Sequence, residues 1–203
     1  MSKEISSKIR STFEDSIELK RIILKKDLFR ALEKCGNLIT ESIKEGGKLM
    51  ICGNGGSAAD AQHLSAELLV RLTSKVNRKG LPAISLLQDT STLTAIINDF
   101  SRDEIFSRNL LTLSGPEDVL LALTTSGNSP NIVKALQKAK EINLKTIGFL
   151  GSDGGAALEY CDEAFIVPSE ITARIQEVHI TAGHAILQYV EDVLINEGFI
   201  DQE

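Results

Sequence analysis

The chain has 203 residues, of which 42% are hydrophobic and 25% charged, and its formal net charge is −6 at pH 7. This balance is typical of one folded globular domain and excludes a disordered chain. No apolar run approaches the roughly 20 residues of a membrane-spanning helix, and no basic block of the kind that binds nucleic acid is present. We therefore expect neither a membrane nor a nucleic acid as a partner.

The cysteines and the N-terminal residues predict a cytoplasmic protein. Residues 1–20 mix charges with apolar positions and lack the apolar core of a secretory signal. Cys35, Cys52 and Cys161 are odd in number and widely spaced, without a Cys-x-x-Cys pair. This pattern indicates neither a disulfide framework nor a thiolate zinc site, and it fits a reducing compartment.

The N-terminal segment, residues 1–45, predicts two amphipathic helices. Apolar residues recur at helical spacing at Ile5, Ile9, Phe13 and Ile17, and again at Leu28, Ala31, Leu32, Cys35, Leu38 and Ile39.

From residue 46 onward, short apolar strands alternate with helices. The predicted strands are Lys48–Cys52, Pro82–Leu87, Asp118–Thr124, Lys145–Leu150 and Ala164–Pro168. The predicted helices are Ser57–Leu72, Thr90–Asn98, Glu104–Leu113, Pro130–Ile142, a short stretch at Ala156–Tyr160, and a long final helix over Thr172–Asn196. This order predicts an α/β fold with a doubly wound, parallel, five-stranded sheet flanked by helices. We expect one domain over residues 1–203, with N-terminal helices in 1–45 and the α/β core in 46–203.

Such a sheet binds ligands beyond the carboxyl ends of its strands, where one predicted turn is rich in hydroxyl groups. The segment 124–130, Thr-Thr-Ser-Gly-Asn-Ser-Pro, follows a strand and opens a helix, with Ser129 suited to the N-cap and Pro130 to the first helical position. Hydroxyls and free N–H groups at a helix N-terminus can hold a phosphate. Ordinary helix capping would explain the same residues. The turn has no lysine as in a Walker loop, which argues against a nucleoside triphosphatase.

A second turn, Gly53-Asn54-Gly55-Gly56-Ser57, follows another predicted strand. Its three glycines would let the backbone approach a ligand closely, although glycines also serve simple tight turns. The spacing is not Gly-x-Gly-x-x-Gly, so it does not predict dinucleotide binding. Two small, polar turns at neighbouring strand ends favour a ligand crevice.

Candidate acid and base groups lie on two predicted helices. His63 and Glu67 are four residues apart on one helix face, with Arg71 one turn further on. Taken alone, this spacing is better explained by a surface ion pair or a capped helix face than by a site. The last helix carries several polar residues in an otherwise apolar run: Arg174, Gln176, Glu177, His179 and His184. Buried polar groups must be paired, so this run indicates either a helix–helix interface or a site.

These segments together resemble the signature of phosphoheptose isomerases, which have a sugar isomerase (SIS) domain. The resemblance spans nearly the whole chain and rests on Gly53–Ser57 with His63 and Glu67, Asn98-Asp99-Phe100, Thr125–Ser129, and Arg174-Ile175-Gln176-Glu177 followed by His184. The serine-rich turn is common to SIS domains, whereas the joint set of His63, Glu67, Gln176 and His184 is narrower. Thr124 stands where serine is frequent in the family, and Ala173 where an acidic residue can occur.

The resemblance implies a homotetramer that converts sedoheptulose 7-phosphate to D-glycero-D-manno-heptose 7-phosphate for bacterial heptose and lipopolysaccharide precursors. It implies one Zn²⁺ per subunit held by positions matching His63, Glu67, Gln176 and His184, with Glu67 and His184 as the catalytic pair. The implied substrate-binding residues are Asn54, Gly55, Gly56, Ser57, Glu67, Arg71, Asn98, Asp99, Thr124, Thr125, Ser126, Ser129 and Gln176. A carboxylate and an imidazole suit the proton transfers of a ketose–aldose isomerisation.

Helix geometry adds one constraint on the metal site. Gln176 and His184 are eight residues apart, or about 12 Å along a helix axis. Either the ion lies midway between them or a second subunit supplies a ligand, and we favour a site at a subunit interface. His179 does not share a face with His184 and is expected at an interface.

Two alternatives belong to other functional classes. SIS folds also occur as non-enzymatic proteins, such as the tetrameric protein that binds the bacterial replication initiator, and those relatives are expected to lack the full acid, base and ligand set. A sugar-phosphate sensor would keep the serine-rich turn and need no base.

Overall fold

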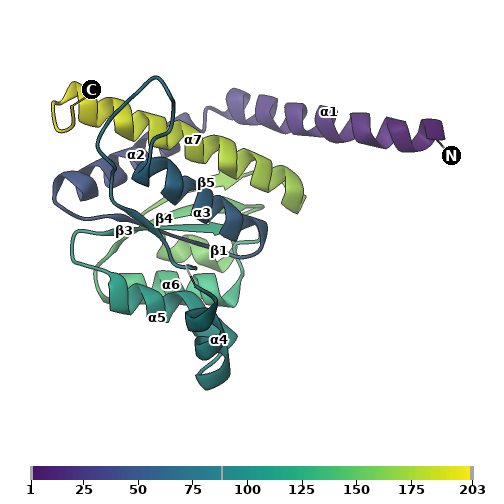
Figure 1. Cartoon of the computed structure of the whole chain (residues 1–203). Coiled ribbons are helices and arrows are strands. Elements are labelled where there is room, and N and C mark those ends of the chain that lie inside the picture. The colour runs from purple at the N-terminus through teal and green to yellow at the C-terminus, as the bar shows by residue number, and fades with distance from the viewer. Residues whose placement is uncertain (1, 88, 202–203) are drawn as a thin grey trace.

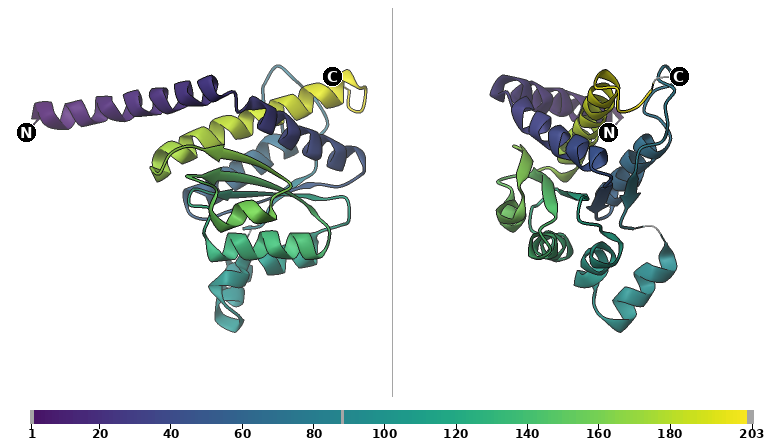
Figure 2. Two further views of the ribbon diagram at one scale, coloured as in Figure 1. Left: turned by 180° about the vertical axis from the view of Figure 1, so that it is seen from behind. Right: turned by 90° about the vertical axis from the view of Figure 1, so that its left-hand side faces the viewer.

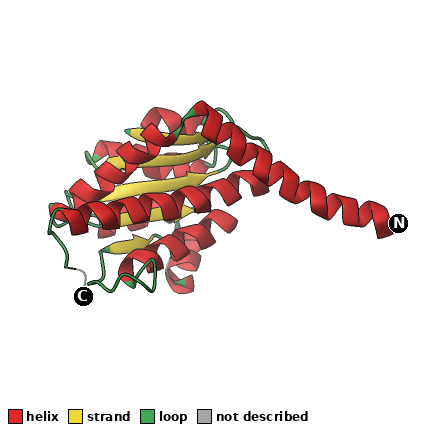
Figure 3. Cartoon of the chain, turned by 90° about the horizontal axis from the view of Figure 1, so that it is seen from above, coloured by secondary structure: helices red, strands yellow, loops and turns green. Residues whose placement is uncertain are grey.

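The computed structural model describes residues 2–87 and 89–201. Within these residues, parallel strands form a five-stranded sheet in the order β2-β1-β3-β4-β5 (Figure 3). Their bounds are β1 Leu49–Gly53, β2 Ala83–Ser85, β3 Val119–Thr124, β4 Lys145–Gly151 and β5 Glu163–Val167. This confirms the predicted fold class. The expected domain limits at residues 1 and 203 lie outside the described residues, and the single-domain organisation stays a prediction.

Helices cover both faces of the sheet. The α-helices are α1 Ser2–Lys26, α2 Phe29–Lys44, α3 Gly56–Leu69, α4 Thr90–Asp99, α5 Ile105–Leu113, α6 Pro130–Glu141 and α7 Thr172–Asn196, with short 3-10 helices η1 Arg102–Glu104 and η2 Gly155–Tyr160. α2, α3 and α7 lie on one face and α5 and α6 on the other (Figure 1). None of these helices, in the part of the chain that the structure describes, is long and apolar enough to cross a membrane.

The central strands are apolar throughout because both of their faces are covered. In β3, Leu121 and Leu123 pack into the core under α2, α3 and α7, whereas Leu120 and Ala122 pack into the core over α5 and α6. Successive side chains of a strand point to opposite faces, so a strand between two helical layers needs apolar residues at every position.

The strand order places a topological switch point between β1 and β3. The chain leaves β1 for β2 on one side and returns to β3 on the other side of β1. The two turns singled out in the sequence follow these two strands. In doubly wound sheets, ligands bind in the crevice that opens at this point.

The N-terminal helix α1 extends away from the body of the chain as an arm (Figure 2). Its last turns are anchored, because Leu19 and Ile23 are buried against the core. Along the arm, large apolar side chains remain exposed at Ile5, Ile9, Phe13 and Ile17. The expected amphipathic pattern is present, but within one chain this apolar stripe has no layer to cover it.

Helix α3 ends at Leu69 rather than at the expected Leu72. The Arg78 guanidinium donates to the backbone carbonyls of Glu67 and Leu68, and the Leu81 N–H also donates to the Leu68 carbonyl. The carbonyl groups at the end of α3 are therefore satisfied by the following loop, and the helix needs no further turn.

His179 lies in the core of its own chain. Its side chain is fully buried between α7 and the sheet, where Nε2 is 3.2 Å from the Leu150 carbonyl oxygen and the ring centroid is 5.7 Å from that of Phe149. Burial lowers the pKa of His179 from 6.5 to about 4. His179 thus lies at the contact between α7 and the sheet of its own chain, and not at an interface between subunits.

Candidate active site

A cavity of about 320 Å³ lies at the switch point between β1 and β3. Its lining residues are Asn54, Gly55, Gly56, Ser57, Leu123, Thr124, Thr125, Ser129, Thr172 and Gln176. The cavity thus brings together most of the residues expected to bind substrate. Both turns open α-helices, so free N–H groups and partial positive charge from the N-termini of α3 and α6 are available at its edge.

The turn after β3 leaves its hydroxyl groups available to a ligand. Ser129 is the N-cap of α6 and Pro130 is the first helical residue, as expected, yet the Ser129 side chain makes no capping hydrogen bond. Its Oγ lies 3.3 Å from Thr124 Oγ1 instead. Gly127 has a φ of +65°, and a Cβ there would lie 2.0 Å from the Gly154 carbonyl oxygen, so this turn requires glycine.

An amide pair that the sequence analysis did not find joins the two turns. Asn54 Nδ2 donates to Asn131 Oδ1 and Asn131 Nδ2 donates to Asn54 Oδ1, both at 2.9 Å. Asn54 lines the cavity, whereas Asn131 lies in the first turn of α6. Asn131 therefore holds a cavity residue in place from the neighbouring turn. Since 77 residues separate the two, sequence spacing offers no signal for this contact.

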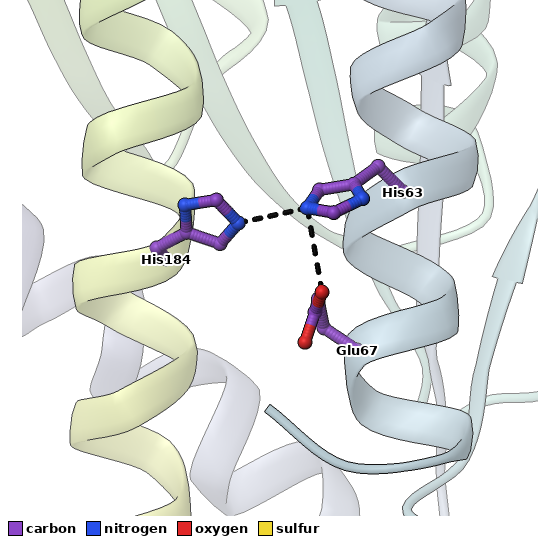
Figure 4. Close-up of side chains that lie close together, drawn as sticks. All are labelled: His63, Glu67 and His184. Atoms are coloured by element: carbon purple, nitrogen blue, oxygen red, sulfur yellow. Dashed lines mark hydrogen bonds and ion pairs between the residues drawn. The ribbon is translucent and has the colours of Figure 1, made fainter. Parts of the chain in front are cut away.

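A second group of polar side chains lies further along α3 and α7. His63 and Glu67 of α3 face His184 of α7 (Figure 4). His63 Nε2 is 2.8 Å from His184 Nε2 and 3.4 Å from Glu67 Oε1. Only 19% of the Glu67 side chain is exposed, against 48% of the His63 side chain. Three of the four residues expected as acid, base or metal ligands, His63, Glu67 and His184, therefore come together.

This group has the composition and spacing of a metal centre. One ligand atom from each of His63, Glu67 and His184 lies within 4.8 Å of the others. In a tetrahedral zinc site, ligand atoms lie about 3.3 Å apart, because each bond is about 2.0 Å long. Two imidazoles and a carboxylate are ordinary zinc ligands, so these residues fit the ion that the resemblance implies.

Asp60, one turn before His63, faces the same group. Its Oδ2 is buried and makes no hydrogen bond to any group that the structure describes. Burial raises the pKa of Asp60, and the nearby His63 and His184 act in the opposite direction. Asp60 is not among the residues expected from the sequence, although its spacing of three and seven residues from His63 and Glu67 places all three on one helix face.

Gln176 lies at the cavity rather than beside the histidines of its own chain. Its side-chain amide covers Gly56, where a Cβ would lie 2.7 Å from Nε2. Further along the same two helices, a Cβ on Gly183 would lie 2.7 Å from the side chain of Leu64. α3 and α7 therefore run side by side in the same direction, and His184 is about 12 Å beyond Gln176 along α7.

The structure places the other predicted substrate residues elsewhere. Asn98 and Asp99 are exposed at the end of α4, where Asn98 Nδ2 donates to Asp99 Oδ1 at 2.8 Å. Arg71 is exposed just beyond α3, and Ser126 is exposed with its Oγ accepting from the Asn128 N–H. None of these residues lines the cavity within the described chain.

Comparison with known proteins agrees with this arrangement. The SIS domain family model matches residues 13–151. The phosphoheptose isomerase of Chlorobaculum parvum is 49% identical over 180 residues, which cover 88% of this chain and 86% of that protein. The chain belongs to the phosphoheptose isomerase family. The family member from Clostridium acetobutylicum is 46% identical over 190 residues, covering 93% of this chain and 96% of that protein.

Solved structures of phosphoheptose isomerases have the same fold. The enzyme GmhA from Neisseria gonorrhoeae matches with a TM-score of 0.85 and 36% identity over 93% of this chain and 99% of that chain. The one from Francisella tularensis matches with a TM-score of 0.86 and 35% identity over 92% of this chain and 97% of that chain. The expected family is confirmed.

Proposed function

We propose that this protein is a phosphoheptose isomerase that converts sedoheptulose 7-phosphate to D-glycero-D-manno-heptose 7-phosphate through an enediol, as a step towards bacterial heptose and lipopolysaccharide precursors. The observation that carries the proposal is the meeting of His63 and Glu67 with His184, because it assembles an acid–base group from helices far apart in the sequence. Membership of the phosphoheptose isomerase family supports the choice of sugar.

The cavity at the switch point binds the phosphate end of the sugar in this proposal. Hydroxyls of Thr124 and Ser129, which line the cavity, and the N–H groups at the start of α6 would donate to the phosphate oxygens. Asn54 and Gln176 would contact the sugar hydroxyls, since both line the cavity.

The proton transfers belong to the group on α3 and α7. In the proposed reaction, the Glu67 carboxylate takes a proton from C1 of the ketose and returns it to C2 of the enediol. His184 moves a proton between the oxygens on C1 and C2, for which an imidazole is suited near neutral pH. The Glu67 side chain is only 19% exposed and lies beside His63, so it is held within the group that would carry out the proton transfers.

One Zn²⁺ per subunit is part of the proposal, with His63, Glu67 and His184 as ligands. For Glu67 to act as the base as well, its carboxylate would have to be partly released from the ion. When bound, the ion would polarise the substrate oxygens on C1 and C2. Gln176 of the same chain lies at the cavity, so as a fourth ligand it would come from a partner subunit. The buried, unpartnered Oδ2 of Asp60 is consistent with a positive charge nearby.

We also propose a homotetramer with its active site at a subunit interface, in the cytoplasm. Two features support the assembly. The apolar stripe of α1 is exposed in the single chain, and such stripes mark contact surfaces. Asn98 and Asp99 lie outside the cavity of their own chain, so they would reach the site of a neighbour.

The alternative functional classes differ from this proposal in whether the function requires the Glu67 carboxylate. A non-enzymatic SIS protein that binds the replication initiator needs no acid–base group, and a sugar-phosphate sensor needs only the cavity. The complete group of His63, Glu67 and His184 favours the enzyme.

The test is incubation of the purified, zinc-loaded protein with sedoheptulose 7-phosphate, with the product identified by NMR. We expect the manno-configured heptose 7-phosphate to accumulate to an equilibrium ratio. Binding of the sugar phosphate without turnover would support the sensor. Turnover of another ketose phosphate alone would overturn the choice of substrate.

A further inference from the structure

Arg78 and Glu191 form an ion pair inside the protein. Arg78 lies in the segment between α3 and β2, and its Nε donates to Glu191 Oε1 of α7. The exposed fractions of the two side chains are 0% and 2%, and among the ion pairs of the described residues this is the one with both partners buried. The pair lies outside the groups already assigned to substrate, metal and proton transfer.

The same guanidinium holds the end of helix α3. Arg78 NH2 donates to the Glu67 carbonyl at 3.1 Å, and NH1 donates to the Leu68 and Lys79 carbonyls at 2.9 and 3.1 Å. Glu67 lies in the last turn of α3, which ends at Leu69. The last turn of a helix has carbonyl groups without helical partners and frays unless other donors satisfy them. Arg78 therefore fixes the turn that carries the proposed base.

Glu191 connects this helix end to the helix that carries His184. It lies seven residues after His184 on α7, or about two turns further along the same face. At the level of the histidines, Leu64 of α3 packs against Gly183 of α7. The group of His63, Glu67 and His184 thus lies beside two contacts that hold α3 and α7 together, one apolar and one ionic.

Stability alone is a weak reason for such a pair. The cost of removing two charges from water often cancels their attraction, and well-packed apolar residues serve as well or better. A charged pair with fixed hydrogen-bond directions does, however, define the relative position of the elements it joins.

We propose that Arg78 and Glu191 are positioning residues, which hold the Glu67 carboxylate and the His63 imidazole at working distance from His184. This inference rests on the proposed function, because it assigns the pair a role in the same site. Neither residue touches the substrate in this proposal. Both act through the backbone of α3 and the spacing between α3 and α7.

The test compares Arg78→Lys and Glu191→Gln with the parent in three measurements: kcat and KM for sedoheptulose 7-phosphate, zinc affinity by competition with a chromophoric chelator, and thermal unfolding. Lysine keeps the charge but cannot donate to three carbonyls and a carboxylate at once. Glutamine keeps the size of Glu191 and removes its charge. We expect kcat to fall about 10- to 100-fold, since misplacement by about 1 Å can cost 10²-fold, with KM changed less than about threefold. Zinc affinity should fall about 10- to 100-fold, as for the loss of supporting groups around a metal.

Asp118→Asn is the matched control. Asp118 is a buried carboxylate that accepts from the Lys48 side chain and from the Lys48 and Gly115 N–H groups, in a segment that contributes no residue to the site. The Asp118→Asn variant should unfold at a lower temperature than the parent, while its kcat and zinc affinity stay at the parent values. If Arg78→Lys and Glu191→Gln change stability alone, as the control does, the positioning role is overturned. If the parent itself neither turns over the sugar nor binds zinc, the proposed function fails instead. Should Arg78→Lys not fold, Glu191→Gln decides the question by the same measurements.

Discussion

His63 Nε2 lies 2.8 Å from His184 Nε2, although 121 residues separate them in the sequence. At this distance the N–H of one ring donates a hydrogen bond to the unprotonated nitrogen of the other, so the two facing nitrogens cannot both carry a proton. Zinc would replace that shared proton, because both nitrogens can then direct their lone pairs at the ion. The pair is therefore satisfied as a hydrogen bond, and the same atoms would serve as ligands in the proposed zinc site.

Removal of zinc should abolish turnover and leave the fold intact. The hydrogen bond between the two histidines compensates for the loss of the ion, so far-ultraviolet circular dichroism should not change after chelation. Activity should return with added zinc. His184→Gln removes a proposed ligand. Its zinc affinity should therefore fall by more than the roughly 10- to 100-fold that is typical when a group that only supports a ligand is lost. A chelated protein that retains full activity would contradict the role of the metal.

The amide pair between the two turns predicts a defect in substrate binding. Asn131→Ala removes both hydrogen bonds to Asn54, each worth about 0.5–1.5 kcal/mol at most in this exposed setting. We expect KM for sedoheptulose 7-phosphate to rise about three- to tenfold, while kcat and zinc affinity stay close to the parent values. A fall in kcat with unchanged KM would place Asn131 in the chemistry instead.

The pH dependence of stability should contain a contribution from His179. Its pKa is about 4 in the folded protein, below the ordinary value of 6.5, because the ring is buried. Between these values the unfolded chain binds a proton that the folded chain does not, so stability is complete above pH 6.5 and falls as the pH decreases towards 4. The loss is about 3 kcal/mol at 1.36 kcal/mol per pKa unit.

His179→Gln lacks this titration. Urea unfolding of both proteins between pH 7 and pH 4 should therefore give a smaller loss of stability in the variant, by about that amount. Identical pH slopes for the two proteins would show that His179 is protonated in the folded state.

A shared active site predicts complementation between inactive variants. Glu67→Gln removes the proposed base, and Asp99→Ala removes a residue that would reach a neighbouring subunit. Each homotetramer should be nearly inactive. Tetramers reassembled from an equal mixture should regain a measurable part of the parent activity, because some sites then contain both native residues. No recovery on mixing, or a fully active monomer, would argue that each chain builds its own complete site.

Local patterns in the sequence predicted the elements, and the topology explains what they could not predict. The apolar runs gave β1, β3 and β4 to within about a residue, and Ser129-Pro130 correctly marked the start of α6. These features depend on neighbours along the chain. The contacts of Arg78 with Glu191 and of Asn54 with Asn131 depend on strand order and helix placement, which no local pattern encodes. Asp60, in contrast, could have been found from the sequence, since its helical spacing from His63 is visible there.

The composition of the site was predictable from the sequence, and so was the separation of Gln176 from His184 along one helix, but the turn that Gln176 contacts was not. The group of His63, Glu67 and His184 is present as expected. Gln176 lies instead against Gly56 at the cavity, because α3 and α7 run side by side in the same direction and keep residues eight apart at opposite ends of the site. Exposure of Asn98, Asp99 and Arg71 follows from their places at the ends of α4 and α3.

The most direct test of the account is kcat for sedoheptulose 7-phosphate in Glu67→Gln, beside the parent and the exposed control Glu170→Gln. Glutamine preserves the shape of the side chain and cannot take a proton. We expect kcat to fall at least about 100-fold in Glu67→Gln, since a general base contributes about 10²- to 10⁴-fold, and to stay unchanged in the control. A Glu67→Gln protein that is folded and zinc-loaded and keeps kcat within threefold of the parent would contradict the role of Glu67 as the base.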